Sequence, residues 1–469
     1  MLPEEMAQAQ FYGLSEDEER QLGATLHPQL LERHGGAYGD SQLGGYVAVV
    51  GAQVAAASGA PLDRFTFTLV NDPEVNAFAL PGGYVYICRG LIALLSNEAE
   101  LAGVLGHELG HTIARHRSRQ EGQKSFSRLL TLGLGTLGGL AGLGSGGFDA
   151  ARQFGDDYLR SYSREHEFEA DELGIAYMSK AGYEPSGTAS VLFKLREYSR
   201  LQAVLAGGSA DDADVFDAMA THPQAAVRVA RAGQIAQTLG RQGRIDGDAY
   251  LDAVEGLAFG GDPDEGLILG RTFVHRGLGF RFDVPEGFRM TKRPGRVVAV
   301  PPGSDKVAIV FDRGDGRFQG PMTQYAQFLA PQGVILRELE RLDINGMEAA
   351  TGWYEIASEA DQMDIRVVAV RLAPGDIFSF QFLAPLWDMA RLGRVFRETT
   401  YSFRRLTALE MAGTQIRRVH TLVVGARDTV PSLALLMKVG SHHEAWFRLL
   451  NGLHPRQEVK AGDRVKLVV

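Results

Sequence analysis

The first 260 residues alternate between hydrophobic spacing typical of helices and hydrophobic spacing typical of strands. Leucines recur at helical spacing in SEDEERQLGATLHPQLLERHG, which begins at Ser15 and stops at two glycines. DRFTFTLVND and VNAFALPGGYVYICRG have the composition of strands, with an Asn-Asp-Pro turn between them. This part of the chain is therefore predicted to be mainly α-helical with a small sheet.

Two further helices are predicted in the same part of the chain. The first begins near Ser96, where Asn97 and Glu100 form a capping box, and it continues through His116. The second covers YLRSYSREHEFEADELGIAYMSKAGY and is followed by glycine and proline. Both helices carry histidines and carboxylates, so the side chains that share one helix face are the ones that can act together.

The hydrophobic pattern changes beyond residues 258–266, which are predicted to be a linker. About six segments of strand spacing and two of helical spacing follow. None of them has His, Asp or Glu clustered at metal-ligand spacing. We therefore expect residues 261–412 to form an α/β accessory domain used for binding or scaffolding.

Residues 413–469 follow the order strand, helix, helix, strand. This βααβ order resembles a LysM module, with DT, LNG and GDRV in the matching places. Arg427 stands where such modules usually have glycine, so two interpretations stay open: a module used only for packing, or a peptidoglycan binder. The chain is thus predicted to be multidomain, with domains at residues 1–260, 261–412 and 413–469.

Composition narrows the classes of function. The 469 residues carry a formal net charge of −9 and have a pI near 5.8, which argues against a general nucleic-acid binder. Cys88 is the single cysteine. The sequence therefore predicts that no internal disulfide can form and that no thiolate-based metal site is possible.

Two segments bear on localisation. The N-terminal stretch has no basic start followed by an apolar run, so no signal peptide is expected, and the chain is either cytoplasmic or a mature form. Residues 129–148 carry no charge and are long enough to span a bilayer, but they include eight glycines. The preferred prediction for this segment is a mobile lid or a hairpin that touches a membrane.

The stretch GHELGHTIARH carries the strongest chemical signal. On a helix, His107 and His111 lie one turn apart, so both imidazoles reach one point. Zinc binds such nitrogens at ~2.0–2.1 Å and keeps a further position for water at a catalytic site. Glu108 lies within reach of that water and is expected to act as the general base. The stretch therefore predicts a zinc-dependent hydrolase of the HExxH type.

A third ligand is needed, and His116 is the nearest histidine. The metzincin pattern has a glycine that turns the chain, but Ala114 stands at that position, and His116 follows His111 by five residues instead of six. On a continuing helix this offset points about 140° away, and no residue is expected to turn the chain back. His116 is predicted to lie at the surface or to contact a ligand. The neighbouring arginines are predicted to form a solvated basic face: Arg115, Arg117 and Arg119.

The second predicted helix supplies carboxylates instead. Glu167 and Asp171 are four residues apart and share a face, so one can bind metal while the other hydrogen-bonds a ligand imidazole. The other acidic residues of this stretch are predicted to form a solvated face: Glu165, Glu169 and Glu172.

Together, VNAFALPGG, HELGH and YSREHEFEADELG resemble the Ste24/HtpX-like zinc metallopeptidases, in particular their soluble BepA-like members of the bacterial periplasm. The resemblance covers roughly the first 260 residues. It implies a gluzincin-type metalloprotease domain that binds one Zn²⁺ per chain. Carried over by position, it implies these roles: His107, His111 and Glu167 as ligands, Glu108 as the base, and Asp171 as the partner of a ligand. Two neutral imidazoles and one carboxylate leave zinc net positive, which lowers the pKa of its water to ~7.

The resemblance also implies a place for the substrate. The strand within residues 75–87 would border the cleft and accept the substrate backbone as an added antiparallel strand, with Asn76 and Ala77 in contact. An ordinary core hairpin is the alternative. The resemblance further places His222 near the zinc, where it would stabilise the oxyanion or block the open metal position, with Arg228 bracing its loop. A simple helix cap is the alternative for His222.

These observations predict a zinc metalloendopeptidase that acts in protein quality control of the bacterial cell envelope. The predicted partners are unfolded or misassembled protein substrates, peptidoglycan through the C-terminal module, and a membrane surface through residues 129–148; nucleic acid is not expected. The predicted location is the periplasm or the cell envelope. The alternative is a chaperone-like or cell-wall-tethered binding protein whose protease site is self-inhibited.

Overall fold

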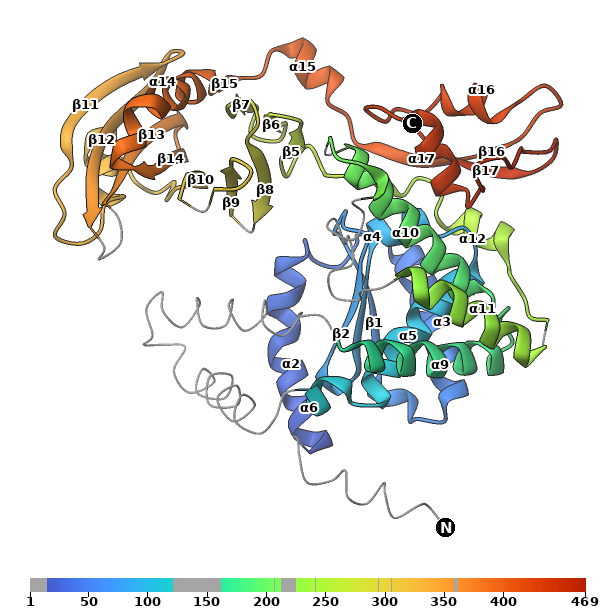
Figure 1. Ribbon diagram of the computed structural model, residues 1–469. Helices are drawn as coiled ribbons and strands as arrows, with labels where there is room; N and C mark the ends of the chain where they lie inside the picture. Colours follow the sequence, from blue (N-terminus) through green and yellow to red (C-terminus); the bar gives the residue numbers. More distant parts are fainter. Residues whose placement is uncertain are drawn as a thin grey trace. The chain divides into compact units, whose positions relative to one another are not determined.

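The protein divides into two compact units (Figure 1). Unit 1 holds Met1–Gly260 and Arg417–Val469, and unit 2 holds Gly261–Ile416. No described helix is long and apolar enough to cross a membrane. Residues 129–148 lie outside the described residues. The structure is a computed structural model, described for these residues: 15–120, 162–205, 207–211, 225–240, 242–293, 295–304, 306–357 and 362–469.

A small sheet lies at the centre of the N-terminal part of unit 1. The elements around it are α2 (Glu16–Arg33), α3 (Ser41–Ser58), β1 (Thr66–Val70), β2 (Ala77–Leu80), β3 (Tyr84–Cys88), α4 (Arg89–Leu94) and α5 (Glu98–Ile113). The strand order is β1-β3-β2, with β1 parallel and β2 antiparallel to β3. Side chains alternate along β3: Tyr86 and Cys88 pack with α2, whereas Ile87 packs with α3 and α5. The sheet therefore lies between α2 and the pair α3 and α5 (Figure 1).

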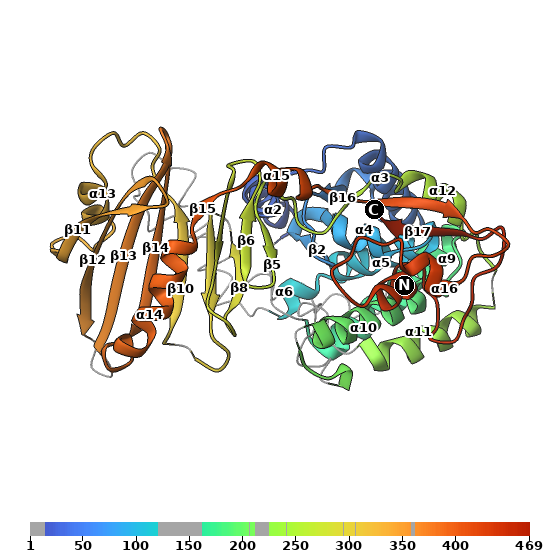
Figure 2. The same ribbon diagram turned by 90° about the horizontal axis from the view of Figure 1, so that it is seen from above.

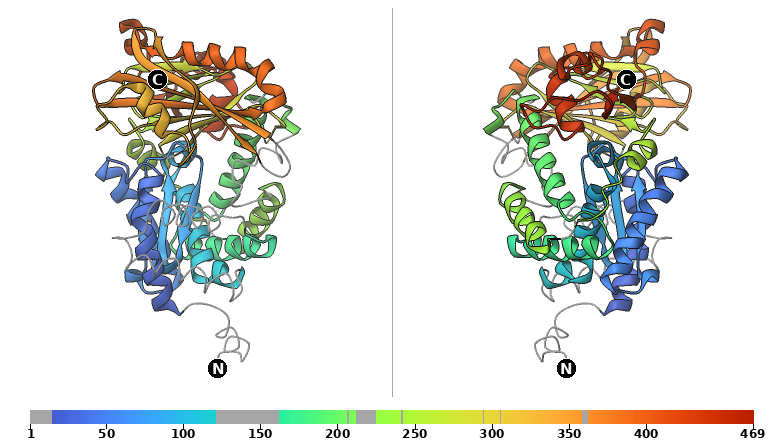
Figure 3. Two further views of the ribbon diagram at one scale, coloured as in Figure 1. Left: turned by 90° about the vertical axis from the view of Figure 1, so that its left-hand side faces the viewer. Right: turned by 90° about the vertical axis from the view of Figure 1, so that its right-hand side faces the viewer.

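Three further helices complete this part: α9 (Arg164–Lys180), α10 (Gly187–Leu205) and α11 (Ala225–Leu239). α9 and α10 pack on α5, and α11 packs on α9 and α10; Figure 3 shows the three helices together in green. Glycines let the backbones of α5 and α9 approach closely, because a Cβ on Gly106 would lie 2.9 Å from the Gly174 carbonyl oxygen. A Cβ on Gly110 would lie 2.8 Å from the Ala170 carbonyl oxygen. This close crossing brings the HELGH residues of α5 to the carboxylates of α9.

Helix α5 differs from the prediction at both ends. At its start, Asn97 caps the helix by accepting from the Glu100 N–H, but the Glu100 carboxylate accepts from the Ser96 N–H, so the predicted capping box is half formed. At its end, the helix stops at Ile113 and does not continue through His116. Arg115 adopts a left-handed conformation, with φ of 54°, and a new helix, α6 (His116–Gln120), begins after it.

The C-terminal segment packs within unit 1. It consists of β16 (Arg417–Val423), α16 (Val430–Ala434), α17 (His443–Leu450) and β17 (Arg464–Val468). β16 lies between β17 and β4 (Ala258–Phe259) in a three-stranded sheet, with both pairings antiparallel. The strand, helix, helix, strand order is therefore present, and this segment continues the sheet that begins at residue 258.

Unit 2 is built on antiparallel sheets with a phenylalanine-rich core. A seven-stranded sheet has the order β11-β12-β13-β14-β10-β9-β8, and a four-stranded sheet has the order β15-β7-β6-β5. The main helices are α13 (Met322–Phe328) and α14 (Leu386–Ser402), which pack on opposite faces of the larger sheet (Figure 2). The strands are β5 (Leu267–Leu269), β6 (Thr272–His275), β7 (Phe280–Asp283), β8 (Arg289–Arg293), β9 (Arg296–Val300), β10 (Ala308–Arg313), β11 (Arg337–Ile344), β12 (Met347–Ala357), β13 (Gln362–Ala373), β14 (Asp376–Pro385) and β15 (Arg404–Arg405).

The sequence predicts about six of these strands, and each of the six predicted segments contains a strand. The strands that it misses include the two edges of the larger sheet, β8 and β11, whose sequences are RMTKR and RELERLDI. An edge strand of this kind carries charge and lacks hydrophobic alternation, so it gives no strand signal.

Candidate active site

Three side chains from α5 and α9 form a buried cluster that could hold a metal ion. The donor atoms of His107, His111 and Glu167 all lie within 4.8 Å of one another. The two Nε2 atoms are 3.0 Å apart, and the Glu167 carboxylate oxygens lie 3.5 Å from His107 Nε2 and 3.4 Å from His111 Nε2. Ligands that each lie ~2.0–2.1 Å from a tetrahedral ion are about 3.3–3.4 Å from one another. Both the donor types and the spacing therefore fit zinc.

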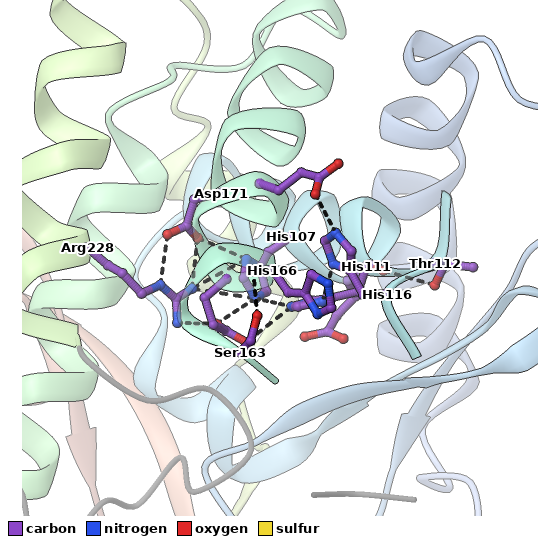
Figure 4. Close-up of polar contacts among 11 residues, drawn as sticks. His107, His111, Thr112, His116, Ser163, His166, Asp171 and Arg228 are labelled. Carbon is purple, nitrogen blue, oxygen red and sulfur yellow. Dashed lines mark hydrogen bonds and ion pairs between the residues drawn. The ribbon is translucent and has the colours of Figure 1, made fainter. Parts of the chain in front are cut away.

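Asp171 and Arg228 lie together beside this cluster, on the side of His107 (Figure 4). Asp171 Oδ1 lies 2.9 Å from His107 Nδ1, the ring nitrogen that does not face the other donors. Arg228 donates to both oxygens of Asp171 at 2.8 Å, and its Nη1 lies 2.5 Å from Glu167 Oε2. Burial raises the pKa of Asp171, but the charge of Arg228 and the bonds from Arg228 and His107 hold it below its ordinary value. Arg228 thus places one buried positive charge against two buried carboxylates, those of Glu167 and Asp171.

His116 is buried, which corrects the prediction of a surface residue. Its relative exposure is 0%, and its Nδ1 lies 2.9 Å from His111 Nδ1. The expectation that no residue turns the chain back is wrong, because the left-handed conformation of Arg115 redirects the chain. The ring of His116 stacks on His166 at 4.4 Å, and burial lowers the pKa of His116 to about 4. His116 therefore contacts a predicted ligand, the other role that the sequence left open.

The predicted basic face after α5 is also wrong in part. Arg117 is buried, with its guanidinium 4.5 Å from the centre of the Tyr162 ring. Tyr162 in turn stacks on His111 at 3.8 Å, and burial raises the pKa of Tyr162 to about 12. Arg115 pairs with Glu19 at 2.8 Å. Only Arg119 is well exposed, and it pairs with Glu169.

Sequence reasoning missed Tyr162 and Arg117 as neighbours of the cluster. Tyr162 directly precedes the Ser163 cap of α9, and a lone aromatic residue at that position gives no chemical signal. Of the predicted solvated face, Glu165 and Glu172 are exposed, while Glu169 is half-buried and lies 3.2 Å from His116.

The remaining predicted residues lie beside the cluster or outside the described residues. Glu108 is 2% exposed and lines a small cavity together with Ala77, His107 and Arg228. Asn76 and Ala77 are buried at the start of β2, and no strand among the described residues pairs with the second edge of β2. His222 lies outside the described residues.

Comparison with known proteins confirms the resemblance drawn from the sequence. Residues 41–236 match Peptidase family M48. The beta-barrel assembly-enhancing protease of Yersinia pestis is 34% identical over 197 residues, 40% of this chain and 39% of the relative. Its counterpart in Escherichia coli strain K12 is 30% identical over 198 residues, 40% of this chain and 39% of the relative. The mitochondrial metalloendopeptidase OMA1 of Schizosaccharomyces pombe is 27% identical over 230 residues, 47% of this chain and 61% of the relative.

The chain therefore spans about two fifths of the length of the bacterial relatives that it matches. Solved structures give weaker likenesses. Cyanobacterial PsbP from Synechocystis sp. PCC 6803 covers 30% of this chain and 95% of its own, with 15% identity and a TM-score of 0.25. The Ran-binding protein Mog1p of Saccharomyces cerevisiae covers 28% of this chain and 93% of its own, with 15% identity and a TM-score of 0.23.

Proposed function

We propose that this chain, whose residues 41–236 match Peptidase family M48, is a zinc-dependent metalloendopeptidase of the gluzincin type. The observation that carries the proposal is the convergence of His107, His111 and Glu167 from two helices, with spacing that suits a tetrahedral ion. Glu108 follows the first of these ligands directly and lines the cavity beside it.

Each neighbour of the cluster has a role in this proposal. His107, His111 and Glu167 would hold one Zn²⁺, which supplies a Lewis acid and an acidified water molecule when bound. Asp171 accepts a hydrogen bond from His107 Nδ1 and so fixes which nitrogen faces the ion. Arg228 offsets the charge of both carboxylates and holds Glu167 in place. The stack of Tyr162 on His111 limits rotation of that ring.

Glu108 would act as the general base. Its carboxylate is buried beside His107, so a proton taken from the attacking water stays in the cavity and is available to the leaving amine. His222 would contribute from outside the described residues, either to the oxyanion or as a brake.

The edge of β2 that pairs with no strand in the described part of the chain would bind the substrate. A peptide that pairs with this edge would extend the order β1-β3-β2 by one antiparallel strand and contact Asn76 and Ala77, of which Ala77 lines the same cavity as Glu108. Backbone pairing of this kind makes little demand on sequence, which suits unfolded or misassembled proteins as substrates. The names of the bacterial relatives support a place in quality control of the cell envelope.

The test is a Glu108→Gln variant measured for zinc content and for cleavage of an unfolded protein such as casein. We expect about one zinc per chain in the variant and in the wild type, with cleavage lower by a factor on the order of 10² or more. Glu165→Gln, an exposed carboxylate on α9, is the matched control and should change neither quantity. Full cleavage by the Glu108→Gln variant would remove Glu108 from the reaction.

A second candidate function is a tethered, self-inhibited protease. The strand, helix, helix, strand order of residues 417–468 supports a LysM-like module that binds peptidoglycan. Sedimentation of the full chain with purified peptidoglycan tests this part, since a packing module would stay in solution. Casein cleavage by His222→Ala tests the brake: a rise supports self-inhibition, whereas a fall supports oxyanion stabilisation.

A further inference from the structure

A second cluster of metal-binding side chains lies on the other face of the small sheet. The donor atoms of His34, Asp72 and Cys88 all lie within 4.8 Å of one another. His34 is the C-cap of α2, Asp72 follows β1, and Cys88 ends β3. Cys88 belongs to the core that packs on α2, whereas Ile87 beside it faces α5, the helix of the candidate active site.

The imidazole of His34 is held in place but is not fully bonded. Its Nδ1 lies 2.6 Å from Asp72 Oδ2, and its ring packs 4.8 Å from Phe78. Its Nε2 is buried and has no hydrogen-bond partner among the described residues. The residue as a whole is only 7% exposed, and this nitrogen is buried as well. A buried ring nitrogen without a partner is costly, and an ion bound at this nitrogen would remove the cost.

A nucleophilic role for this cluster is less consistent with its chemistry. Cysteine, histidine and aspartate could form a catalytic triad, but Cys88 is 0% exposed, and burial raises the pKa of its thiol well above the ordinary value. A buried, protonated thiol is inert toward a substrate. Metal binding removes this difficulty, since the ion displaces the thiol proton to solvent.

We propose that His34, Asp72 and Cys88 form a second site, for a divalent ion of the zinc type, in which the Cys88 thiolate is a ligand. One thiolate, one carboxylate and one neutral imidazole balance a doubly charged ion, so the ion and its three ligands together carry no net charge. A single cysteine predicts no thiolate-based site, but a mixed donor set needs only one thiolate. The ion would join the end of α2 to the ends of β1 and β3, a structural role that is independent of peptide cleavage.

Cobalt substitution tests the proposal, because a thiolate bound to Co²⁺ gives a near-ultraviolet charge-transfer band. Cys88 is the only cysteine, and the candidate active site offers only nitrogen and oxygen, so any such band reports this cluster. The full chain is stripped with a chelator, kept in a phosphine reductant that has no thiol, and titrated with Co²⁺. We expect the band in the wild type, with about two cobalt ions bound per chain.

Variants separate the two sites. Cys88→Ser should lose the band and one of the two ions, and Asp72→Asn should weaken the band. Glu167→Gln should lose the other ion and keep the band, so the failure of one site is distinguishable from the failure of the other. A wild-type chain that binds cobalt without the band overturns the proposal, even if Cys88→Ser does not fold. A band that survives in folded Cys88→Ser overturns it as well.

Discussion

The two units bury different kinds of side chain. Unit 1 buries ionised and ionisable groups near its candidate sites, among them Glu108, Glu167, Asp171 and Arg228. Unit 2 buries rings instead: Phe280, Phe282, Phe378, Phe380, Phe382, Phe396 and Phe403 are all at most 2% exposed. Buried charge costs free energy unless each group finds a partner, whereas buried rings stabilise the fold directly. Unit 1 therefore gathers buried charge at its candidate sites, whereas the core of unit 2 is dominated by aromatic rings.

The largest expected effect concerns the C-terminal segment of unit 1. Removing residues 417–469 takes away β16, the partner of β4, and the buried Lys466, whose ammonium donates to the carbonyl oxygens of Ala93 and Leu95. These carbonyls lie at the end of α4, just before α5. We expect the truncated chain to lose both cooperative unfolding of unit 1 and bound zinc, measured by circular dichroism and metal analysis.

The control for this truncation is Lys460→Met, which changes an exposed lysine of the same segment. It should leave the unfolding midpoint and the zinc content unchanged. A truncated chain that keeps its zinc would instead show that the segment is a separate domain, as the sequence predicts.

The next largest effect tests the aromatic core of unit 2. Phe282 is 1% exposed, and the centre of its ring lies 4.6 Å from that of Phe311 and 5.1 Å from that of Phe380. Phe282→Ala should lower the free energy of unfolding of unit 2 by about 3–5 kcal/mol, measured by denaturant titration. Zinc content should not change. Phe328→Ala removes a ring that is 63% exposed and should cost at most about 0.5 kcal/mol.

A smaller effect is expected where unit 1 buries charge. Arg228→Met leaves Glu167 and Asp171 buried without their common cation, so the site becomes less well organised for metal. We expect zinc affinity to fall by about 10–100-fold, measured by competition with a chelator. Arg231→Met is a matched control on the same helix, since its pair with Glu172 is about half exposed. Equal losses in the two variants would contradict the distinction between buried and exposed charge.

Local patterns made much of the site predictable. The HELGH stretch lies within one helix, and Glu167 and Asp171 lie within another, so helical spacing predicts which of these side chains share a face. The cluster then forms where the two helices cross. The turn at Arg115 was not predictable, because no sequence pattern indicates that this non-glycine residue adopts a positive φ. The cluster of His34, Asp72 and Cys88 was missed for another reason: its members come from three elements that only the folded sheet brings together.

The free energy of unfolding of unit 2 is expected to depend on pH through its histidine. His275 is the only histidine between residues 261 and 416, and burial together with the charges of Lys292 and Arg313 lowers its pKa to about 4, although Asp262 and Asp264 act in the opposite direction. The unfolded chain therefore binds more protons than the folded one between about pH 6.5 and 4. Stability from the neutral ring is present above this window and is lost as the pH falls through it.

We expect the free energy of unfolding of unit 2 to decrease by about 1–3 kcal/mol across this window on account of His275. His275→Gln does not titrate, and its amide oxygen can still accept from the Leu278 N–H that the ring accepts from. Denaturant titrations at several pH values should therefore show a flatter dependence in the variant. The same slope in both proteins would assign the acid sensitivity to other groups.

The smallest effect on unit 1 is expected from the largest deletion, the removal of unit 2. Unit 2 leaves unit 1 after β4 and returns at β16, where Phe259 pairs with Arg417 and Ala258 with Arg418. Because the two strands are already antiparallel neighbours, an Asn-Gly turn in place of residues 260–416 would close them as a two-residue hairpin. If unit 1 folds and binds zinc without unit 2, this shortened chain should keep the zinc content and the unfolding midpoint of unit 1 within error. A loss of either would show that unit 1 depends on unit 2 for its stability. The two units would then fold as one instead of separately.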